Sequence, residues 1–123
     1  MKYLCLVYGE EKAIGAMTDN ECMAYDQSLR NSGKCLASEA LQPVRTAATV
    51  RVRNGKVNVT DGPFTESKEI VGGFAILQAN SKREAVELVE EFLQVAGDGE
   101  CEVRQVFEAG QDTCAQEIGR AHV

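Results

Sequence analysis

Residues 71–107 read VGGFAILQANSKREAVELVEEFLQVAGDGECEVRQVF, and this stretch predicts a complete strand–helix–strand unit. Ser81 and Glu84 form a capping box, in which each side chain satisfies a free backbone N–H group at a helix start. Apolar residues then recur at helical spacing: Ala85, Leu88, Val89, Phe92 and Ala96. Gly97 follows the last of them and is typical of a helix end. The flanking apolar runs, Val71–Ala79 and Cys101–Phe107, predict strands.

The first half of the chain repeats this plan. A strand is predicted over Lys2–Tyr8, and a second capping box spans Thr18–Glu21. Cys22, Tyr25 and Leu29 recur at helical spacing, Gly33 ends the helix, and Lys34–Leu41 is the next strand. Two such units with both helices on one face predict a ferredoxin-like βαββαβ sandwich, an α+β fold, over residues 1–107.

An additional β-hairpin is predicted between the two halves. Asn54-Gly55 is the preferred two-residue type I′ turn, and it separates the alternating strands Thr49–Arg53 and Lys56–Thr60. In that register the valines share one face, with Val52 opposite Val57 and Val50 opposite Val59. An isolated hairpin is marginally stable in water. We therefore expect the valine face to pack either on the domain's own sheet or on a partner subunit.

Composition limits the possible partners and cofactors. The chain has 123 residues, enough for one core, and its net charge of −6 argues against a nucleic-acid partner. Its apolar runs are too short for a membrane span, so a cytoplasmic location is expected. The five cysteines are scattered without a C-x-x-C pair, and the one histidine is His122. This pattern predicts no metal site and no cofactor, and it favours buried, apolar roles for the thiols.

The turn Asp61-Gly62-Pro63-Phe64 holds a carboxylate at a rigid position directly after the hairpin. Such a carboxylate can orient a substrate, accept a proton, or cap the turn through its own backbone. Three further charged side chains are candidates for substrate binding: Glu39, Lys68 and Arg104. Arg104 shares a strand face with Glu102, so it either holds an anionic ligand or forms an exposed ion pair. Lys68 is either a substrate-binding residue or a solvated charge on a loop.

Several motifs in order carry a resemblance to a known family: Glu39–Pro43, Val50–Lys56, Thr60–Glu69, Gly72–Phe74 and Glu102–Arg104. Together they resemble the YCII-related family, in its DGPF-motif branch. The resemblance implies a dimeric α/β-barrel, in which two ferredoxin-like sheets pack face to face and enclose a cleft. It also implies a likeness in shape to small monooxygenases and muconolactone isomerase. Branch members often carry His where Lys34 stands here, so a mechanism that needs an imidazole base is disfavoured.

These patterns together predict a homodimeric small-molecule enzyme or binder with a cleft near the DGPF turn. In that hypothesis Asp61 is the catalytic residue, and the substrate-binding residues are Glu39, Phe64, Lys68 and Arg104. Two alternatives stay open. One is a regulatory interaction protein associated with an alternative sigma factor, which the family resemblance suggests, and the other is a structural dimer without a ligand.

The C-terminal residues are interpreted separately from the domain. Residues 108–117 are predicted to be an extension. Residues 118–123, Ile-Gly-Arg-Ala-His-Val, match the translation of a common sequencing adapter, ATC GGA AGA GCA CAC GTC. We therefore expect this segment to be an artefact rather than part of the fold.

Overall fold

The computed structural model describes residues 1–10, 20–63 and 69–108, with the side chains of residues 20 and 21 excepted. Several predictions fall outside these residues: the capping box at Thr18, the roles of Phe64 and Lys68, and the C-terminal extension with its adapter-like end.

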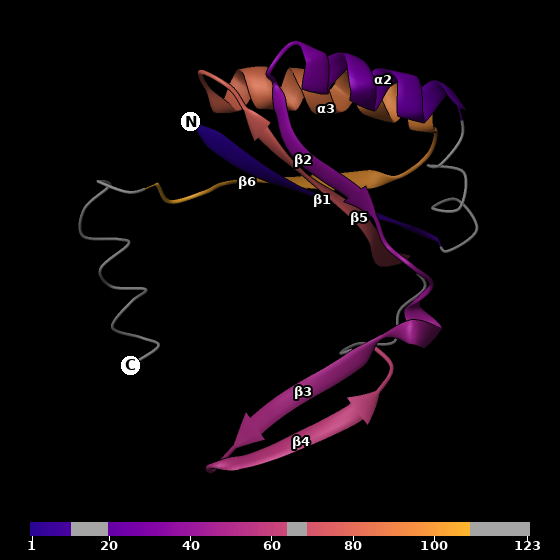
Figure 1. Cartoon of the computed structure of the whole chain (residues 1–123), viewed down its shortest axis with the longest axis vertical. Coiled ribbons are helices and arrows are strands. Elements are labelled where there is room, and N and C mark those ends of the chain that lie inside the picture. The colour runs from indigo at the N-terminus through magenta and orange to yellow at the C-terminus, as the bar shows by residue number, and fades with distance from the viewer. Residues whose placement is uncertain (11–19, 64–68, 109–123) are drawn as a thin grey trace.

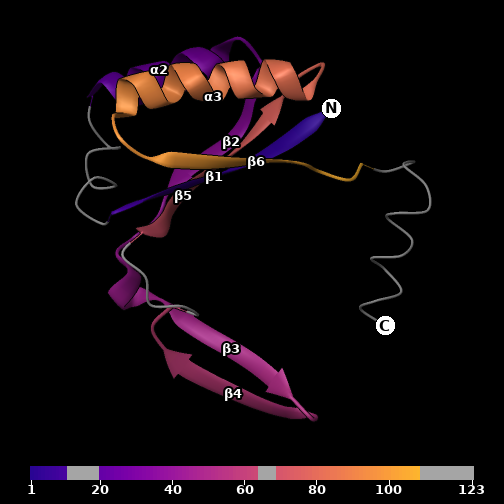
Figure 2. The same cartoon turned by 180° about the vertical axis from the view of Figure 1, so that it is seen from behind.

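The centre of the molecule is a four-stranded antiparallel sheet. Its strands are β1 (Lys2–Glu10), β2 (Cys35–Ala40), β5 (Glu69–Gln78) and β6 (Glu100–Gln105), in the spatial order β2-β5-β1-β6. The two helices, α2 (Asn20–Asn31) and α3 (Lys82–Ala96), lie side by side over one face of this sheet (Figures 1 and 2). This is the predicted ferredoxin-like α+β architecture. In the part of the chain that the structure describes, no helix covers the opposite face of the sheet, called the open face below (Figure 2).

Alternation along the strands decides which side chains meet the helices. In β1, Tyr3, Cys5 and Val7 are buried, while Leu4 and Leu6 between them are only half-buried. Cys5 packs with Leu77, Leu88 and Val89 in one core cluster, and Tyr3 packs with Ala79 and Ala85 in a second. Leu4 and Leu6 therefore point to the open face.

The ends of α3 have the capping groups that the sequence predicts. The Ser81 hydroxyl accepts a hydrogen bond from the Glu84 backbone N–H at 3.2 Å, and the Asn80 N–H donates to the Glu84 carboxylate at 3.4 Å. At the other end Gly97 has φ +98°, and its N–H donates to the Leu93 carbonyl at 2.9 Å. A left-handed backbone favours glycine at this position.

The predicted hairpin is present and projects from the body. After the 3₁₀ turn η2 (Val44–Thr46), strands β3 (Ala48–Arg53) and β4 (Lys56–Asp61) form a two-stranded sheet, called the arm below. Asn54 and Gly55 have φ +51° and +77°, as a type I′ turn requires. The register is the predicted one, including the Val52–Val57 and Val50–Val59 pairs.

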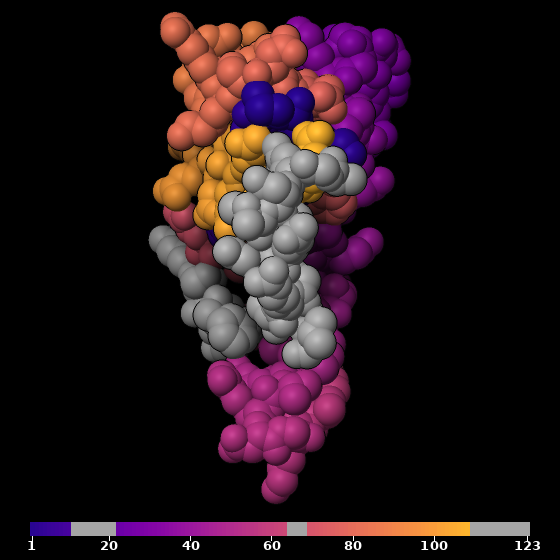
Figure 3. Space-filling model, turned by 90° about the vertical axis from the view of Figure 1, so that its left-hand side faces the viewer, coloured from indigo at the N-terminus to yellow at the C-terminus, as the bar shows by residue number. Residues whose placement is uncertain are grey.

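The valine face of the arm does not pack on the protein's own sheet. Val50, Val52, Val57 and Val59 are 62–68% exposed, and the arm protrudes beyond the body (Figure 3). The arm is attached at its base, where the Gly62 N–H donates to the Ala47 carbonyl at 2.7 Å and the Thr49 hydroxyl donates to the Gly62 carbonyl at 2.8 Å. The described residues of the chain therefore leave the valine face uncovered.

Candidate functional site

A cavity of about 370 Å³ lies between the helix layer and the sheet. Its inner part is lined by core residues, among them Cys5, Leu77, Leu88 and Val89. Its outer part is lined by exposed residues of α2 and β2, among them Met23, Gln27, Arg30 and Glu39. The cavity therefore opens to solvent between α2 and β2. Its volume is within the range of roughly 300–1,000 Å³ that is common for small-molecule pockets.

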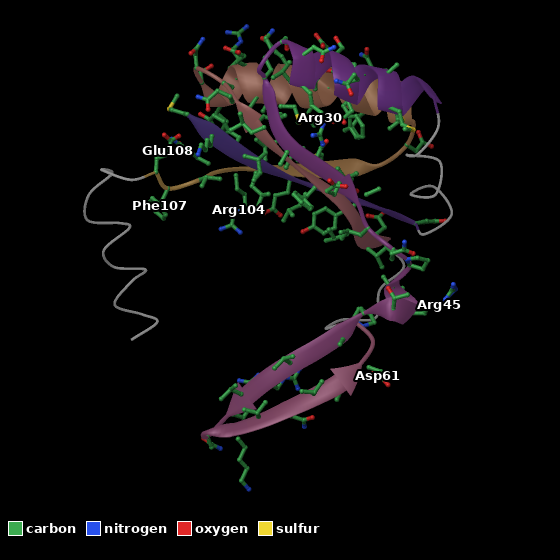
Figure 4. All side chains as sticks on the ribbon, viewed as in Figure 1. Arg30, Arg45, Asp61, Arg104, Phe107 and Glu108 are labelled. Atoms are coloured by element: carbon green, nitrogen blue, oxygen red, sulfur yellow. The ribbon has the colours of Figure 1, made fainter. Side chains whose placement is uncertain are left out.

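A polar cluster of Asp26, Arg30 and Ser38 stands at this opening. Asp26 and Arg30 are one helical turn apart on α2 and form an ion pair, with 2.9 Å between Nε and Oδ2. Arg30 Nη2 also donates to the Ser38 carbonyl at 2.7 Å and to the Ser38 hydroxyl oxygen at 2.8 Å. The Ser38 hydroxyl in turn donates to the Asp26 carboxylate. The cluster ties α2 to β2, and Figure 4 shows Arg30 between these two elements.

Tyr25 joins the two helices above the cavity. Its hydroxyl lies 2.9 Å from both the Leu88 carbonyl oxygen and a carboxylate oxygen of Glu91, and it donates to these acceptors. Burial raises the pKa of the Tyr25 hydroxyl, and the hydrogen bond to Glu91 raises it further. The Tyr25 ring also lies 6.3 Å from the ring of Phe92, another cavity residue.

Four thiols line the same cavity: Cys5, Cys22, Cys35 and Cys101. None of the four forms a disulfide with another described residue, and the first three are buried. The predicted apolar burial of the cysteines therefore holds for these three, while Cys101 is only half-buried. Among the described residues there is no group of three or more His, Cys, Asp or Glu side chains that could hold a metal ion.

The predicted site residues are dispersed over the structure. Asp61 is exposed at the base of the arm, opposite Ala48 and on the same face of the arm as the valines. Arg104 lies on the open face of the sheet and does not point toward Asp61 (Figure 4). Of the predicted site residues that the structure describes, Glu39 alone is also in the cavity lining.

Glu39 and Arg104 stand at opposite edges of the sheet. Glu39 pairs with Phe74 on β5, and Arg104 pairs with Leu4 on β1, so the whole width of the sheet separates them. Arg104 is paired with Glu102 at 3.7 Å, and both side chains are at least half exposed. This is the exposed ion pair that the sequence left open as an alternative, and such a pair contributes little to stability.

Sequence reasoning did not select Asp26, Arg30 or Ser38. The spacing of Asp26 and Arg30 on a predicted helix is a signal for an ion pair. Ser38 has no comparable signal, because it meets α2 only after β2 has taken its place at the sheet edge. The polar cluster is thus a product of tertiary structure.

The order of the strands, the helices on one face and the projecting arm define a class: small proteins built on one ferredoxin-like unit. The YCII-related domain model matches residues 1–109, and this chain belongs to the YCII-related family. Within the described residues, no helix is both long and apolar enough to cross a membrane.

The chain is also similar to one protein in sequence and to another in fold. "Uncharacterized protein R00369" of Rhizobium meliloti (strain 1021) is 31% identical over 98 residues, which is 74% of this chain and 79% of that protein. The fold is similar to 5-chloro-2-hydroxyhydroquinone dehydrochlorinase (TftG) from Burkholderia phenoliruptrix AC1100, solved in complex with 2,5-dihydroxybenzoquinone. The TM-score is 0.52 at 20% identity, with 92% of this chain and all of that chain covered. At this identity the likeness concerns the fold alone.

Proposed function

We propose that this protein is a small-molecule binder or enzyme whose ligand occupies the cavity between the helix layer and the sheet. The observation that carries this proposal is the cavity of about 370 Å³, with an apolar inner lining and the Asp26–Arg30–Ser38 cluster at its opening. A concave apolar site with a few convergent polar groups is the usual form of a ligand pocket.

The charges of the lining indicate the kind of ligand. The carboxylates of Asp26 and Glu39 outnumber the one guanidinium, that of Arg30, and Arg30 is already engaged by Asp26 and Ser38. An anion would gain little at this opening, whereas a hydroxyl or amine could donate to the carboxylates. We therefore infer a neutral ring compound with a hydrogen-bond donor. A protein of similar fold holds 2,5-dihydroxybenzoquinone, which supports a ligand of this size for the fold.

The proposal is tested by filling the cavity from the sheet side. Ala75 lies on β5, faces the helices and lines the cavity, so Ala75→Leu replaces a methyl with an isobutyl group inside it. Ala37 pairs with Ile76 on the other face of the same sheet, which makes Ala37→Leu a matched control outside the cavity.

Phenol, catechol and 1-naphthol serve as probes in thermal unfolding and calorimetric titration. A probe present at one hundred times its dissociation constant stabilises the native state by about 2.7 kcal/mol. We expect this stabilisation in the wild type and in Ala37→Leu, and its loss in Ala75→Leu. Equal stabilisation of all three proteins, or none in the wild type, would contradict the proposal.

We also propose that the protein is a homodimer, in which the arm of each copy lies on the open face of the other. The support is chemical complementarity between two surfaces of the same chain. The arm has an exposed valine face, and the open face has Leu4, Leu6, Phe74 and Ile76 along its centre. Two such apolar surfaces are more stable paired than in water.

The motif Asp61-Gly62-Pro63-Phe64 supports membership in the DGPF-motif branch of the family, which we infer from these residues. Because Asp61 shares the valine face of the arm, a docked arm would carry its carboxylate to a partner subunit. In this proposal Asp61 would therefore act at the dimer interface, where it and Arg104 of the open face would contact the ligand together.

A further inference from the structure

We propose that the cavity selects aromatic hydroxyl compounds, whose hydroxyl group donates to the Asp26 carboxylate in place of the Cys35 thiol while the ring occupies the apolar interior. This inference rests on the proposed small-molecule function of the same cavity, and it names the ligand class and the acceptor atom. Asp26 is thereby the specificity-determining residue of the site, and the Cys35 thiol holds the ligand's position when the cavity is empty.

A β-bulge in the edge strand β2 directs two side chains to the cavity. Cys35 pairs with Leu77 and Ser38 pairs with Ala75, with a register shift directly after Cys35. In a regular strand, residues three positions apart point to opposite faces of the sheet. The extra residue of the bulge removes this difference, so Cys35 and Ser38 both face the helices and both line the cavity. Both therefore contact the same residue of α2, Asp26.

One carboxylate oxygen of Asp26 lies at the boundary between the polar opening and the apolar interior. Oδ1 accepts a hydrogen bond from the half-buried Ser38 hydroxyl and lies 3.8 Å from the Cys35 sulfur. Cys35 is only 6% exposed and belongs to the same core cluster as Leu88, so its thiol is on the apolar side. Asp26 is itself half-buried, whereas Glu39, the other carboxylate of the lining, is exposed. Of these two carboxylates, Asp26 is therefore the acceptor for a ligand whose ring is buried.

The hydrogen-bond donors to Asp26 differ in strength. Oδ2 accepts from Arg30 Nε at 2.9 Å, and Oδ1 accepts from the Ser38 hydroxyl. The third donor is the Cys35 thiol, and an S–H group donates only weakly. A ligand hydroxyl is a stronger donor, and a hydrogen bond to an ionised carboxylate is stronger than one between neutral groups. The exchange of the thiol for a ligand hydroxyl at Oδ1 is therefore favourable.

The displaced thiol retains an acceptor. The Cys35 sulfur also lies 3.4 Å from the Ala37 carbonyl oxygen, a contact within the bulge. Burial is the main cause that raises the pKa of Cys35, and the charge of Asp26 acts in the same direction, so the sulfur keeps its proton at neutral pH. The thiol donates to Ala37 when a ligand occupies its place at Asp26. The exchange thus leaves this buried donor with a partner, as buried polar groups require.

The interior of the cavity favours an aromatic ring as the carrier of the hydroxyl. The rings of Tyr25 and Phe92 lie 6.3 Å apart in the cavity lining, which also contains Leu77 and Leu88. A sugar would bury further hydroxyl groups among these apolar side chains, and a protonated amine would bury a charge there. Both are unfavourable. A phenol has one donor for Asp26 and an otherwise apolar ring.

The test compares phenol with anisole, its methyl ether, which has the same ring but no donor. Calorimetric titration of the folded full chain gives both dissociation constants. We expect the wild type to bind phenol at least tenfold more tightly than anisole. Asp26→Asn should reduce this ratio to threefold or less, because a neutral amide is a weaker acceptor than a carboxylate. A wild-type ratio near one, or an equal ratio in Asp26→Asn, would overturn the proposal.

Asp98→Asn is the matched control for this substitution. Asp98 is exposed and is not among the residues that line the cavity. It removes the same charge from the chain and should retain the wild-type ratio. An equal loss of the ratio in both variants would show that net charge rather than the Asp26 acceptor sets the preference, and it would overturn the proposal.

Cys35→Ala distinguishes the thiol from the carboxylate as the partner of the ligand hydroxyl. Removal of the thiol enlarges the cavity for both compounds, so the ratio of their dissociation constants cancels most of that change. We expect a ratio at or above the wild-type value, because the competing donor is gone. A ratio of threefold or less would assign the ligand hydroxyl to the Cys35 sulfur and overturn the role of Asp26.

A spectroscopic measurement on the wild type does not depend on how well Asp26→Asn folds. The S–H stretching band in the Raman spectrum responds to the acceptor of the thiol, and comparison with Cys35→Ala assigns the Cys35 band. We expect phenol to shift this band and anisole to leave it near its ligand-free position, since only phenol displaces the thiol from Asp26. A band that bound phenol does not shift would refute the exchange.

Failure here is distinguishable from failure of the proposed function. Equal binding of phenol and anisole would leave the cavity as a binding site and overturn only the selection by Asp26. Binding of neither compound would overturn both proposals.

Discussion

The exposed valines of the arm allow a quantitative test of the proposed dimer. Fully burying a valine side chain contributes about 1.5–3 kcal/mol. Val57 is 68% exposed, so docking on a second copy could bury at most that share, which corresponds to about 1–2 kcal/mol. A symmetric dimer contains two arms. Val57→Lys should therefore weaken dimerisation by about 2–4 kcal/mol, because both docked valines are lost and an ammonium must be desolvated or displaced.

A difference of this size is accessible to sedimentation equilibrium. At 1.4 kcal/mol for each tenfold change, the dimer dissociation constant should rise between about 30-fold and 1,000-fold. Thr60→Lys is the matched control, because Thr60 is a β-branched, exposed residue of the same strand on the other face of the arm. It adds the same charge and should leave the dissociation constant within about threefold of the wild-type value. Monomeric wild-type protein at micromolar concentration, or equal weakening by both substitutions, would refute the docking of the valine face.

Two further predictions concern Tyr25 and Asp61. The pKa of the Tyr25 hydroxyl is raised in the folded protein, whereas in the unfolded chain this hydroxyl ionises near its usual pKa of about 10. The free energy of unfolding should therefore fall as the pH rises above about 10. Urea unfolding between pH 8 and pH 11 measures this free energy, and its fall with pH should be smaller in Tyr25→Phe. If the free energy of unfolding falls equally with pH in both proteins, Tyr25 is not the group responsible. Asp61→Asn should change stability by at most about 1 kcal/mol, since the side chain is exposed. If Asp61 acts on a ligand, the same variant should weaken ligand binding at least tenfold, about 1.4 kcal/mol; unchanged binding would assign the residue to the turn alone.

The elements of the fold could be predicted because each depends on local chemistry. Asn54-Gly55 permits the positive φ angles of its turn without any help from the rest of the chain, and it thereby sets the register of all four valines. Ser81 and Gly97 similarly mark the ends of α3 through hydrogen bonds to residues within four positions of themselves. The order of two strand–helix–strand units then restricts the sheet topology to very few possibilities.

The cavity and its polar cluster could not be predicted, because their residues are neighbours only in three dimensions. Asp26 and Arg30 belong to α2, while Ser38 belongs to β2, the edge strand. Likewise, nothing in the spacing of Cys5 and Cys101 indicates that they are diagonal neighbours, since that relation requires β1 and β6 to pair. Within one chain Asp61 and Arg104 also lie apart, because the arm turns away from the sheet (Figure 4).

The sequence by itself therefore determined the helices, strands, turns and family of this protein, because periodicity, capping and turn chemistry act over a few residues. Tertiary structure alone decided which side chains share a cavity, which thiol is accessible and which apolar faces lack a cover. Those properties depend on long-range packing, in which the position of each side chain is set by elements far from it in the chain.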